Sequence, residues 1–258
     1  MVIDYEDGKH LIDRGVMKML SSLAELLIKP MVKGAILATP TLADRLPSSV
    51  PNVIVPGILS DHIPSRQPPP PGESIHLLYS GSLDVERGIP LLLEFLDSGL
   101  IPSGIRLEIT GQGKFAPELE SIAKRNPDQI RFHGKVPEPR LLEIQNRCQF
   151  GLNLQSSSNP ISKVTFPSKT FDYLNAGLRL ITTKSAGVET VIGHAAVYLE
   201  EESVIGLAAA IEQAVAELHS NNGMNVEMLR KDYSLAGTSR RLTNLFARTT
   251  KLPASTIP

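Results

Sequence analysis

Short apolar runs alternate with amphipathic segments along most of the chain. An apolar run bounded by turn residues is typical of a strand buried on both faces, and apolar positions three and four apart are typical of a packed helix. After residue 73 the expected strands are Ile75–Tyr79, Ile105–Ile109, Ile130–Phe132, Phe150–Leu154 and Leu178–Thr182. The expected helices are Ile89–Leu96, Pro117–Arg125, Arg140–Arg147, 167–177, Val204–Leu218 and Thr238–Arg248. This alternation predicts a doubly wound α/β domain with a parallel sheet.

A shorter alternation precedes a proline-rich stretch. Its expected elements are strands Val2–Asp4, Ala35–Ala38 and Asn52–Val55, and helices Arg14–Ile28 and Leu42–Leu46. Four consecutive prolines then favour an extended, semi-rigid linker. We therefore expect a partial α/β segment over 1–63, a linker over 64–73, a complete domain over 74–233, a helix over 234–250 that packs back toward the first segment, and a disordered tail over 251–258.

Bulk composition limits the classes of function. The chain has 258 residues, of which 41% are hydrophobic, which is enough for a folded core. Its formal net charge of −1 argues against a broad nucleic-acid-binding surface. The single cysteine, Cys148, excludes an internal disulfide framework and is expected to be a small buried side chain rather than a nucleophile. With no basic leader and no apolar run near the ~18–20 residues of a membrane span, we expect a cytoplasmic protein, compatible with peripheral contact at the inner face of the membrane.

The strongest local signal lies in residues 166–183. The sequence predicts a short helix over 167–177 that runs straight into a buried strand. The helix N-terminus carries Ser168 and Lys169, with Asp172 one turn further along the same face. Such a terminus can bind a phosphate, and a carboxylate one turn deeper can bind ribose hydroxyls. An ordinary helix-to-strand junction with a solvated lysine–aspartate pair explains the same residues, so the local pattern leaves both interpretations open.

Small residues follow the first two strands of the longer region. Gly81 and Ser82 lie in the loop after the first strand, Arg87 precedes the next helix, and Gly111 and Gly113 lie in the loop after the second strand. Ligands of open parallel sheets bind beyond the carboxyl ends of the strands, where small residues let the backbone approach and an arginine can bind an anion. The histidines lack metal-ligand spacing, and neither a Walker lysine motif nor a G-x-S-x-G elbow occurs. We therefore expect no metal site and no hydrolase triad.

Several motifs, in order, resemble one known family. They are LLYSGSL at 77–83 followed by Arg87 and Gly88, LEITGQG at 107–113, IRFHGKV at 130–136, FPSKTFDYLNAG at 166–177 followed by LRLITT, and AGVE at 186–189. Each is modest alone, but in this order and spacing they are similar to the retaining glycosyltransferases of family four, the glycosyl transferases group 1. The resemblance implies a GT-B-like fold of two facing Rossmann-like domains, here with a complete C-terminal donor domain and a partial N-terminal acceptor domain.

The resemblance also implies contacts to a nucleotide-sugar donor. Asp172 would bind the ribose, Arg87 would neutralise the diphosphate, and Lys135 and Val136 would flank the nucleobase. The loops of Gly81 and of Gly111 and Gly113 would let the backbone approach the diphosphate. With Ser82 and the helix residues Ser168 and Lys169 from the local pattern, these complete the expected donor contacts. The family chemistry needs no metal or other cofactor, because cations and helix N-termini can stabilise the departing diphosphate.

Three features depart from the family pattern. The acid that contacts the transferred sugar in relatives is Val164 here, and a diphosphate-binding arginine is Ser82, whose charge Lys169 is expected to replace. At the front, a strand tip that carries a catalytic histidine in relatives is acidic, so the resemblance implies a catalytic role for Asp4 and Glu6. The first half of the acceptor domain has no counterpart. The chain is therefore expected to be a fragment, an internal start, or one half of a split enzyme whose partner chain supplies the rest.

Three functions are consistent with these residues. The leading hypothesis is retaining transfer of a sugar from a nucleotide-diphosphate donor to a glycan or lipid-linked acceptor in polysaccharide or glycoconjugate synthesis. The alternative is a non-catalytic, nucleotide-sugar-binding half of a split glycosyltransferase, or an inactive paralogue. A sugar-nucleotide epimerase shares the two-domain fold and ranks third, because the acid and base that it needs cannot be placed in this sequence.

Overall fold

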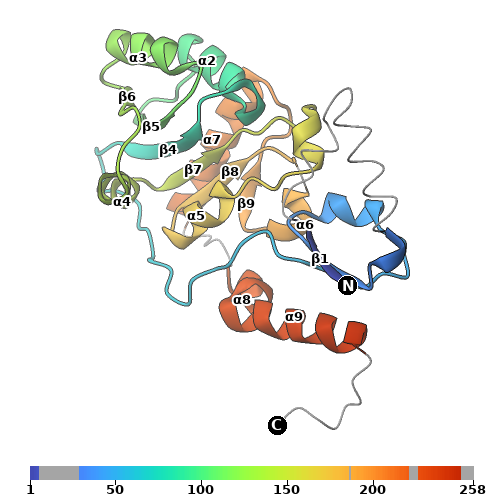
Figure 1. The fold of residues 1–258 in the computed structure, drawn as a ribbon. Helices are drawn as coiled ribbons and strands as arrows, with labels where there is room; N and C mark the ends of the chain where they lie inside the picture. The colour runs from blue at the N-terminus through green and yellow to red at the C-terminus, as the bar shows by residue number, and fades with distance from the viewer. Residues whose placement is uncertain (6–28, 186, 221–225, 251–258) are drawn as a thin grey trace, which may run out of the picture.

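The computed structural model describes residues 1–5, 29–185, 187–220 and 226–250, which form two parallel sheets of unequal size (Figure 1). The larger sheet has the order β6-β5-β4-β7-β8-β9, and all its strand pairs are parallel. In chain order its strands are β4 (Ile75–Ser82), β5 (Ile105–Gln112), β6 (Ile130–Phe132), β7 (Phe150–Asn153), β8 (Arg179–Thr182) and β9 (Ala196–Tyr198). The predicted doubly wound α/β fold is confirmed. The helix expected over Arg14–Ile28 and the tail over 251–258 lie outside the described residues.

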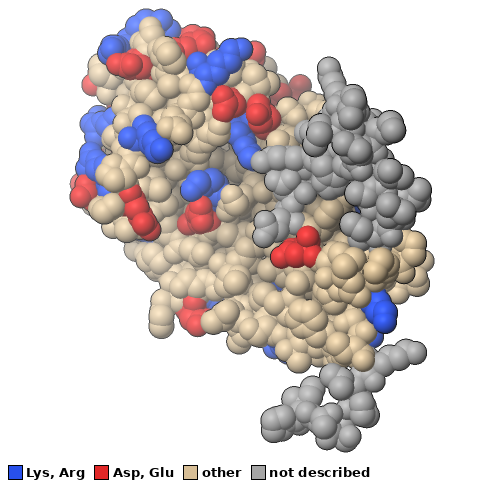
Figure 2. Space-filling view, in the orientation of Figure 1, with Lys and Arg blue, Asp and Glu red and all other residues tan. Residues whose placement is uncertain are grey.

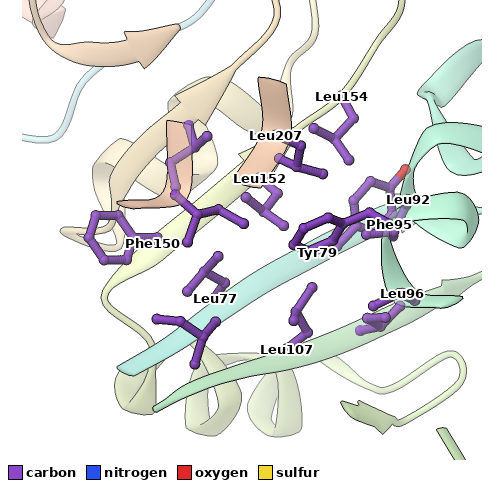
Figure 3. Packing of buried hydrophobic residues seen from close by; sticks show 14 of the residues in the cluster. Leu77, Tyr79, Leu92, Phe95, Leu96, Leu107, Phe150, Leu152, Leu154 and Leu207 are labelled. Carbon is purple, nitrogen blue, oxygen red and sulfur yellow. The ribbon is translucent and has the colours of Figure 1, made fainter. Parts of the chain in front are cut away.

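Helices cover both faces of the larger sheet because successive side chains of a buried strand point to opposite faces. On β4, Leu77 and Tyr79 belong to one apolar cluster and Leu78 to the other. The first cluster also holds side chains of α2 (Ile89–Asp97), α3 (Ala116–Arg125) and α7 (Val204–His219). Figure 3 shows Leu77 and Leu107 on their strands and the α2 side chains beside Tyr79. The second cluster holds side chains of α4 (Glu138–Arg147), α5 (Lys169–Asn175) and α6 (Val188–Ile192).

The smaller sheet has the order β1-β2-β3 and its own small core. Its strands are β1 (Val2–Tyr5), β2 (Gly34–Leu37) and β3 (Asn52–Ile54). Leu37 and Leu42 pack there with Val164, a residue contributed by the loop that follows β7 of the larger sheet. The C-terminal helix α9 (Leu235–Thr250) packs against β2 and β3, and Arg241 Nη1 donates a hydrogen bond of 2.9 Å to the carbonyl of Ile54.

The segment between the two sheets is fixed by hydrogen bonds to the larger one. The Asn175 side chain at the end of α5 accepts from the Ser60 amide at 2.8 Å and donates to the Ile58 carbonyl at 3.0 Å. Arg66 donates to the carbonyl of Ala176 at 2.8 Å and to the side chain of Asn146 at 3.0 Å. This stretch therefore follows the α4–α5 side of the larger sheet over specific contacts.

The structure differs from the sequence prediction mainly in short elements. The expected helix Leu42–Leu46 is a 3-10 helix, η3 (Pro40–Arg45), whose first residue is a proline that has no amide to donate. Besides short 3-10 helices, three elements were not predicted: α6, β9 and α8 (Glu227–Tyr233). Each has seven residues or fewer, so none repeats its periodic pattern often enough to be recognised.

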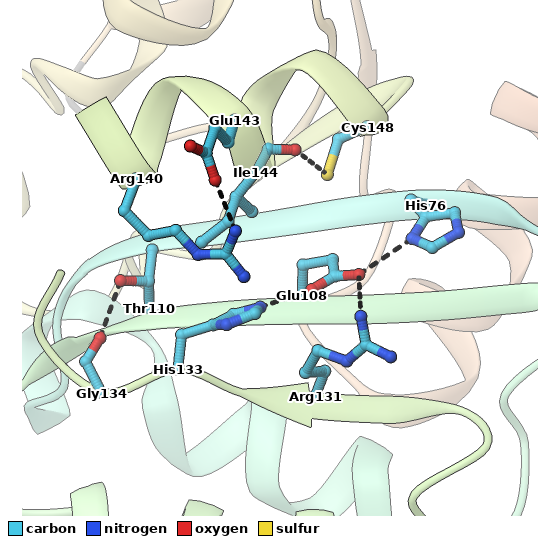
Figure 4. Close-up of polar contacts among 10 residues, drawn as sticks. All are labelled: His76, Glu108, Thr110, Arg131, His133, Gly134, Arg140, Glu143, Ile144 and Cys148. Atoms are coloured by element: carbon cyan, nitrogen blue, oxygen red, sulfur yellow. Dashed lines mark hydrogen bonds and ion pairs between the residues drawn. The ribbon is translucent and has the colours of Figure 1, made fainter. Parts of the chain in front are cut away.

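One buried charge interrupts the apolar face beneath α4 (Figure 4). The Glu108 side chain on β5 is 2% exposed, and its oxygens lie 3.0 Å from His76 Nδ1 and 2.5 Å from His133 Nε2, with Arg131 Nη1 at 3.9 Å. Burial alone would raise the pKa of Glu108, but the hydrogen bonds with His133 and His76 outweigh it and hold that pKa far below its ordinary value. In the same region burial raises the pKa of the Cys148 thiol to about 12, as expected for an inert, buried cysteine.

Acid is expected to remove the stability that ionised Glu108 contributes. Its pKa in the folded chain lies below the unfolded value of about 4.3, so the contribution is complete above that pH and is lost as pH falls toward the folded-state pKa. The difference in unfolding free energy between the parent chain and Glu108→Gln should shrink by about 1 kcal/mol or more between about pH 5.5 and about pH 3.5, since one pKa unit equals about 1.4 kcal/mol. Urea titrations at both pH values measure it, and a constant difference would contradict the expectation.

Candidate functional site

The two glycine-containing loops predicted from the sequence lie side by side at the carboxyl edge of the larger sheet. β4 and β5 pair in a register that sets Gly81 opposite Gly111 and Ser82 opposite Gln112. A Cβ on Gly111 would lie 1.9 Å from the Gly81 carbonyl oxygen, and one on Gly113 would lie 2.7 Å from backbone atoms of Leu83. Both glycines also have positive φ. The close approach of the two loops therefore requires glycine at both positions.

Two adjoining cavities open at this edge, with volumes of about 620 and about 160 Å³. They share Ser80, Gly81, Ser82 and Lys169. The larger is also lined by Asp84, Thr110, Gly111, Gln112, Gly113, Lys135, Val136 and Leu141. The smaller is also lined by Tyr79, Arg87, Leu152, Asn153, Pro167, Ser168 and Tyr173. Nine of the ten donor contacts expected from the sequence thus line one cavity or the other, and the tenth, Asp172, lines neither.

The short helix α5 delivers its first residue to both cavities. It begins at Lys169, slightly later than predicted, with Ser168 immediately before it and Gly177 (φ +76°) just beyond its end. Lys169 Nζ lies 2.8 Å from Asp172 Oδ2, and the two side chains are 41% and 50% exposed. An ion pair this exposed contributes little to stability, so it leaves Lys169 able to exchange its partner for a ligand.

Arg87 is oriented by a buried amide. It ends the 3-10 helix η4 (Val85–Arg87), and its Nη1 donates a 2.5 Å hydrogen bond to Gln155 Oε1. The Gln155 side chain is almost fully buried and donates in turn to the Thr165 carbonyl at 3.3 Å. Because a neutral amide holds this guanidinium, the orientation of Arg87 is fixed without a neutralising charge from Gln155.

A carboxylate joins the two glycine loops at the larger cavity. Asp84 accepts hydrogen bonds from the hydroxyl of Ser82 and, at 3.1 Å, from the amide of Lys114. The hydrogen bond from Ser82, followed by that from Lys114, lowers the pKa of Asp84. Asp84 was not among the predicted site residues, because its backbone partner Lys114 lies 30 positions away in the sequence and no local pattern indicates the contact.

Tyr173 is a second cavity-lining residue that was not predicted. Its hydroxyl accepts a 2.8 Å hydrogen bond from the amide of Ser80 and lies 3.3 Å from the Ser80 carbonyl oxygen. A Cβ on Gly151 would lie 2.3 Å from the ring, so the glycine of β7 makes the space that the ring fills. Tyr173 therefore links α5 to the end of β4 and lines the smaller cavity between them. A glycine within an otherwise apolar strand was the available signal.

Of the two residues expected to be catalytic, one lies away from the cavities and the other lies outside the described residues. Asp4 is exposed on β1 and lines neither cavity, and Glu6 lies outside the described residues. Val164 is 2% exposed within the core of the smaller sheet. Among the residues that the structure describes, no group of three or more histidine, cysteine or acidic side chains is placed to hold a metal ion.

The described surface shows mixed charge. On the face seen in Figure 2, basic and acidic side chains are interspersed rather than gathered into one patch of a single sign. Within the described ranges no helix has both the length and the apolar character to cross a membrane.

Comparisons with known proteins agree with this fold. The family described as glycosyl transferases group 1 matches residues 74–217, whereas comparison with curated proteins gives no significant match. Among solved structures, the chain is similar to the lipopolysaccharide outer core galactosyltransferase WaaB in its apo form, with a TM-score of 0.66 and 14% identity over 86% of this chain and 63% of that one. It is also similar to a sucrose-phosphate synthase from Thermosynechococcus elongatus, with a TM-score of 0.68 and 13% identity over 97% and 68% of the two chains.

A third structure, Anabaena Alr3699/HepE in complex with UDP, has a TM-score of 0.71 and 12% identity over 95% of this chain and 71% of that one. These similarities show the GT-B-type α/β fold. The chain spans less than two thirds of the length of the galactosyltransferase. The family match covers more than half of the chain and contains both glycine loops, Arg87 and α5. The chain therefore belongs to the glycosyl transferases group 1.

Proposed function

We propose that this chain binds a nucleotide-diphosphate sugar at the carboxyl edge of the larger sheet and takes part in retaining transfer of the sugar to a glycan or lipid-linked acceptor. One observation carries the proposal: nine residues singled out from four separate sequence segments line two adjoining cavities. The UDP bound to the Anabaena protein, which has the same fold, is in keeping with a nucleotide ligand.

The charges of the two cavities suit a diphosphate. Arg87 lines the smaller cavity, Lys135 lines the larger one, and Lys169 lines both. Against these three cations, the described lining residues include one carboxylate, that of Asp84, which already accepts two hydrogen bonds. We infer that the cations neutralise the leaving diphosphate without a metal, with Lys169 exchanging Asp172 for phosphate and freeing that carboxylate for the ribose.

The transfer itself needs little covalent chemistry from the chain. The bond between the anomeric carbon and the diphosphate oxygen breaks, and its electron pair leaves on that oxygen. The acceptor hydroxyl forms the new bond to the same carbon on the same face, and its proton goes to the departing diphosphate. Positioning the donor and stabilising the developing negative charge are then the tasks of the residues at the two cavities.

A non-catalytic, donor-binding role is the second candidate, and Val164 favours it. The position that would supply an acid to the transferred sugar holds an apolar side chain that packs with Leu37 of the smaller sheet and Leu42 of η3. In such a protein the nucleotide would be bound and the sugar left unreacted, unless a partner chain supplied the missing groups.

Turnover by the purified chain separates these functions. We expect the full chain to bind UDP, ADP or GDP in calorimetry and to release nucleoside diphosphate from the matching sugar nucleotides when oligosaccharide or lipid-linked acceptors are added. Binding without release would support the non-catalytic role. Failure of the full chain to bind any nucleotide or pyrophosphate would overturn both, and an epimerised sugar nucleotide would revive the third hypothesis.

A further inference from the structure

We propose that Glu108 and Thr110 are positioning residues that fix segment 133–136 in the geometry that binds the nucleobase of the donor. The inference rests on the proposed function, because it assumes that the larger cavity takes a nucleotide. It goes further by assigning a task to the buried charged cluster around Glu108, which does not line the cavity, and to the hydroxyl of Thr110, a lining residue that points to Gly134.

The cavity lining indicates which end would receive a base. Val136 and Leu141 are the only apolar side chains among the described residues that line the larger cavity, and both come from the stretch that begins α4. The smaller cavity has apolar lining as well, from Leu152, Pro167 and the rings of Tyr79 and Tyr173, but it also holds Arg87 beside Ser168 and has only about 160 Å³. A nucleotide has one apolar, planar end and one anionic end, so its base fits the side of Val136 and its phosphates fit the side of Arg87.

Strand β5 restrains the residues just before Val136 through two side chains of one face. Side chains two positions apart on a strand share a face, so Glu108 and Thr110 both point toward α4 (Figure 4). Glu108 contacts His133 at 2.5 Å, and the Thr110 hydroxyl donates to the Gly134 carbonyl at 2.8 Å. Two consecutive residues of segment 133–136, His133 and Gly134, are thus each held by a separate side chain of β5.

Backbone hydrogen bonds complete the same attachment. The His133 amide donates to the Ile109 carbonyl at 2.9 Å, and the Gly111 amide donates to the Gly134 carbonyl at 2.9 Å. Gly134 then turns the chain in the left-handed region, at φ +64°. The next residue, Lys135, lies at the cavity directly after this turn. These hydrogen bonds therefore fix the positions of Lys135 and Val136 in the ligand-free chain.

The chemistry of the cluster favours a positioning role over a purely stabilising one. A buried charged side chain with its partners is often no more stable than apolar side chains of similar volume, because the charge loses its hydration. A buried carboxylate does, however, fix the orientation of the histidine rings that are hydrogen-bonded to it. Fixing a ligand-binding segment in advance lowers the ordering cost of binding, so the benefit appears as affinity for the base.

Two substitutions test the inference without emptying the site. Glu108→Gln keeps the shape but removes the charge that holds His133, and Thr110→Val removes only the hydroxyl that holds Gly134. Glu143→Gln is the matched control for the first, because Glu143 forms a pair with Arg140 on the exposed side of α4. Thr238→Val is the matched control for the second, because the Thr238 hydroxyl is buried in α9 away from the cavities.

Calorimetry with two probes gives the decisive readout. UDP, ADP and GDP contain a base, whereas inorganic pyrophosphate does not. We expect both test variants to bind the preferred nucleotide about tenfold more weakly, as for the loss of one buried hydrogen bond, while pyrophosphate affinity and both controls stay unchanged. Hydrogen exchange in a peptide spanning residues 130–137 of the ligand-free chain should be faster in both test variants.

Three results would overturn the inference. Unchanged nucleotide affinity in both test variants would show that the restraint on segment 133–136 is not used, and an equal loss for pyrophosphate would show a general disturbance of the site. If the parent chain binds pyrophosphate but no nucleotide, the base site does not exist, although the anion site of the proposed function stands. If the parent chain binds neither a nucleotide nor pyrophosphate, the proposed function itself is refuted.

Discussion

Arg87→Ala is expected to weaken nucleoside-diphosphate binding roughly 10- to 100-fold. The guanidinium lines the smaller cavity and is already oriented by Gln155, so it loses little freedom when it binds a phosphate. A hydrogen bond to a charged group contributes about 1.5–3 kcal/mol, which corresponds to this range of affinity. Calorimetric titration with the preferred nucleoside diphosphate measures the change, and the loss should be shared by inorganic pyrophosphate because the contact is to phosphate.

The control for Arg87 is an arginine of the same domain that lies away from the cavities. Arg125→Ala removes one positive charge and an exposed pair with Asp97 at 2.8 Å, but Arg125 lines neither cavity. Arg125→Ala should change the dissociation constant for the nucleoside diphosphate by no more than about twofold, because an exposed ion pair contributes little to stability. Equal effects of the two substitutions would show that net charge, and not a phosphate contact by Arg87, governs binding.

The fold was largely predictable because its strands are buried on both faces. Runs such as Ile75–Tyr79 and Ile105–Ile109 carry their signal in consecutive residues, so one sequence reveals them. These two strands are longer than predicted at their carboxyl ends, where β4 and β5 continue through Gly81 and Gly111. Small and polar residues there look like loop in the sequence, yet they pair because the two strand ends run in register.

The parts that escaped prediction depend on contacts between distant residues. Nothing near Glu108 in the sequence indicates that His76 and His133 will meet it, because parallel pairing of β4, β5 and β6 brings them together. The same holds for Tyr173, which reaches the backbone of Ser80 from α5. The site residues taken from strand-end motifs were easier to find, since every parallel strand ends at one edge of the sheet.

Val164 illustrates how position and contact can differ. Its place before α5 suggested a residue facing the donor sugar, and its apolar side chain suggested a loss of that role. In the structure the side chain turns to the smaller sheet and packs with Leu37 and Leu42. The residue therefore has a packing partner of its own, which no spacing rule could reveal because β2 lies over a hundred residues earlier.

Gly88→Ala is expected to be the most destabilising single substitution considered, at roughly 3 kcal/mol or more. Gly88 has φ +76°, a conformation that costs an alanine about 1–2 kcal/mol. In addition, the new Cβ would lie 1.8 Å from the carbonyl oxygen of Leu154, so the backbone after β7 would have to move. Urea unfolding of the purified variant measures the loss, and failure to fold would be its extreme form.

A second glycine separates the two causes. Gly99 has φ +72°, but a Cβ there would meet nothing within 4 Å, so Gly99→Ala should show the conformational cost alone, about 1–2 kcal/mol. Equal losses in the two variants would contradict the argument from close approach. The excess at Gly88 also bears on function, because this glycine joins Arg87 to the start of α2. Arg87 precedes Gly88 and Gln155 follows Leu154, so a backbone shift that relieves this overlap is expected to disturb the hydrogen bond between their side chains. Gly88→Ala protein that still folds should therefore bind pyrophosphate more weakly than the parent chain.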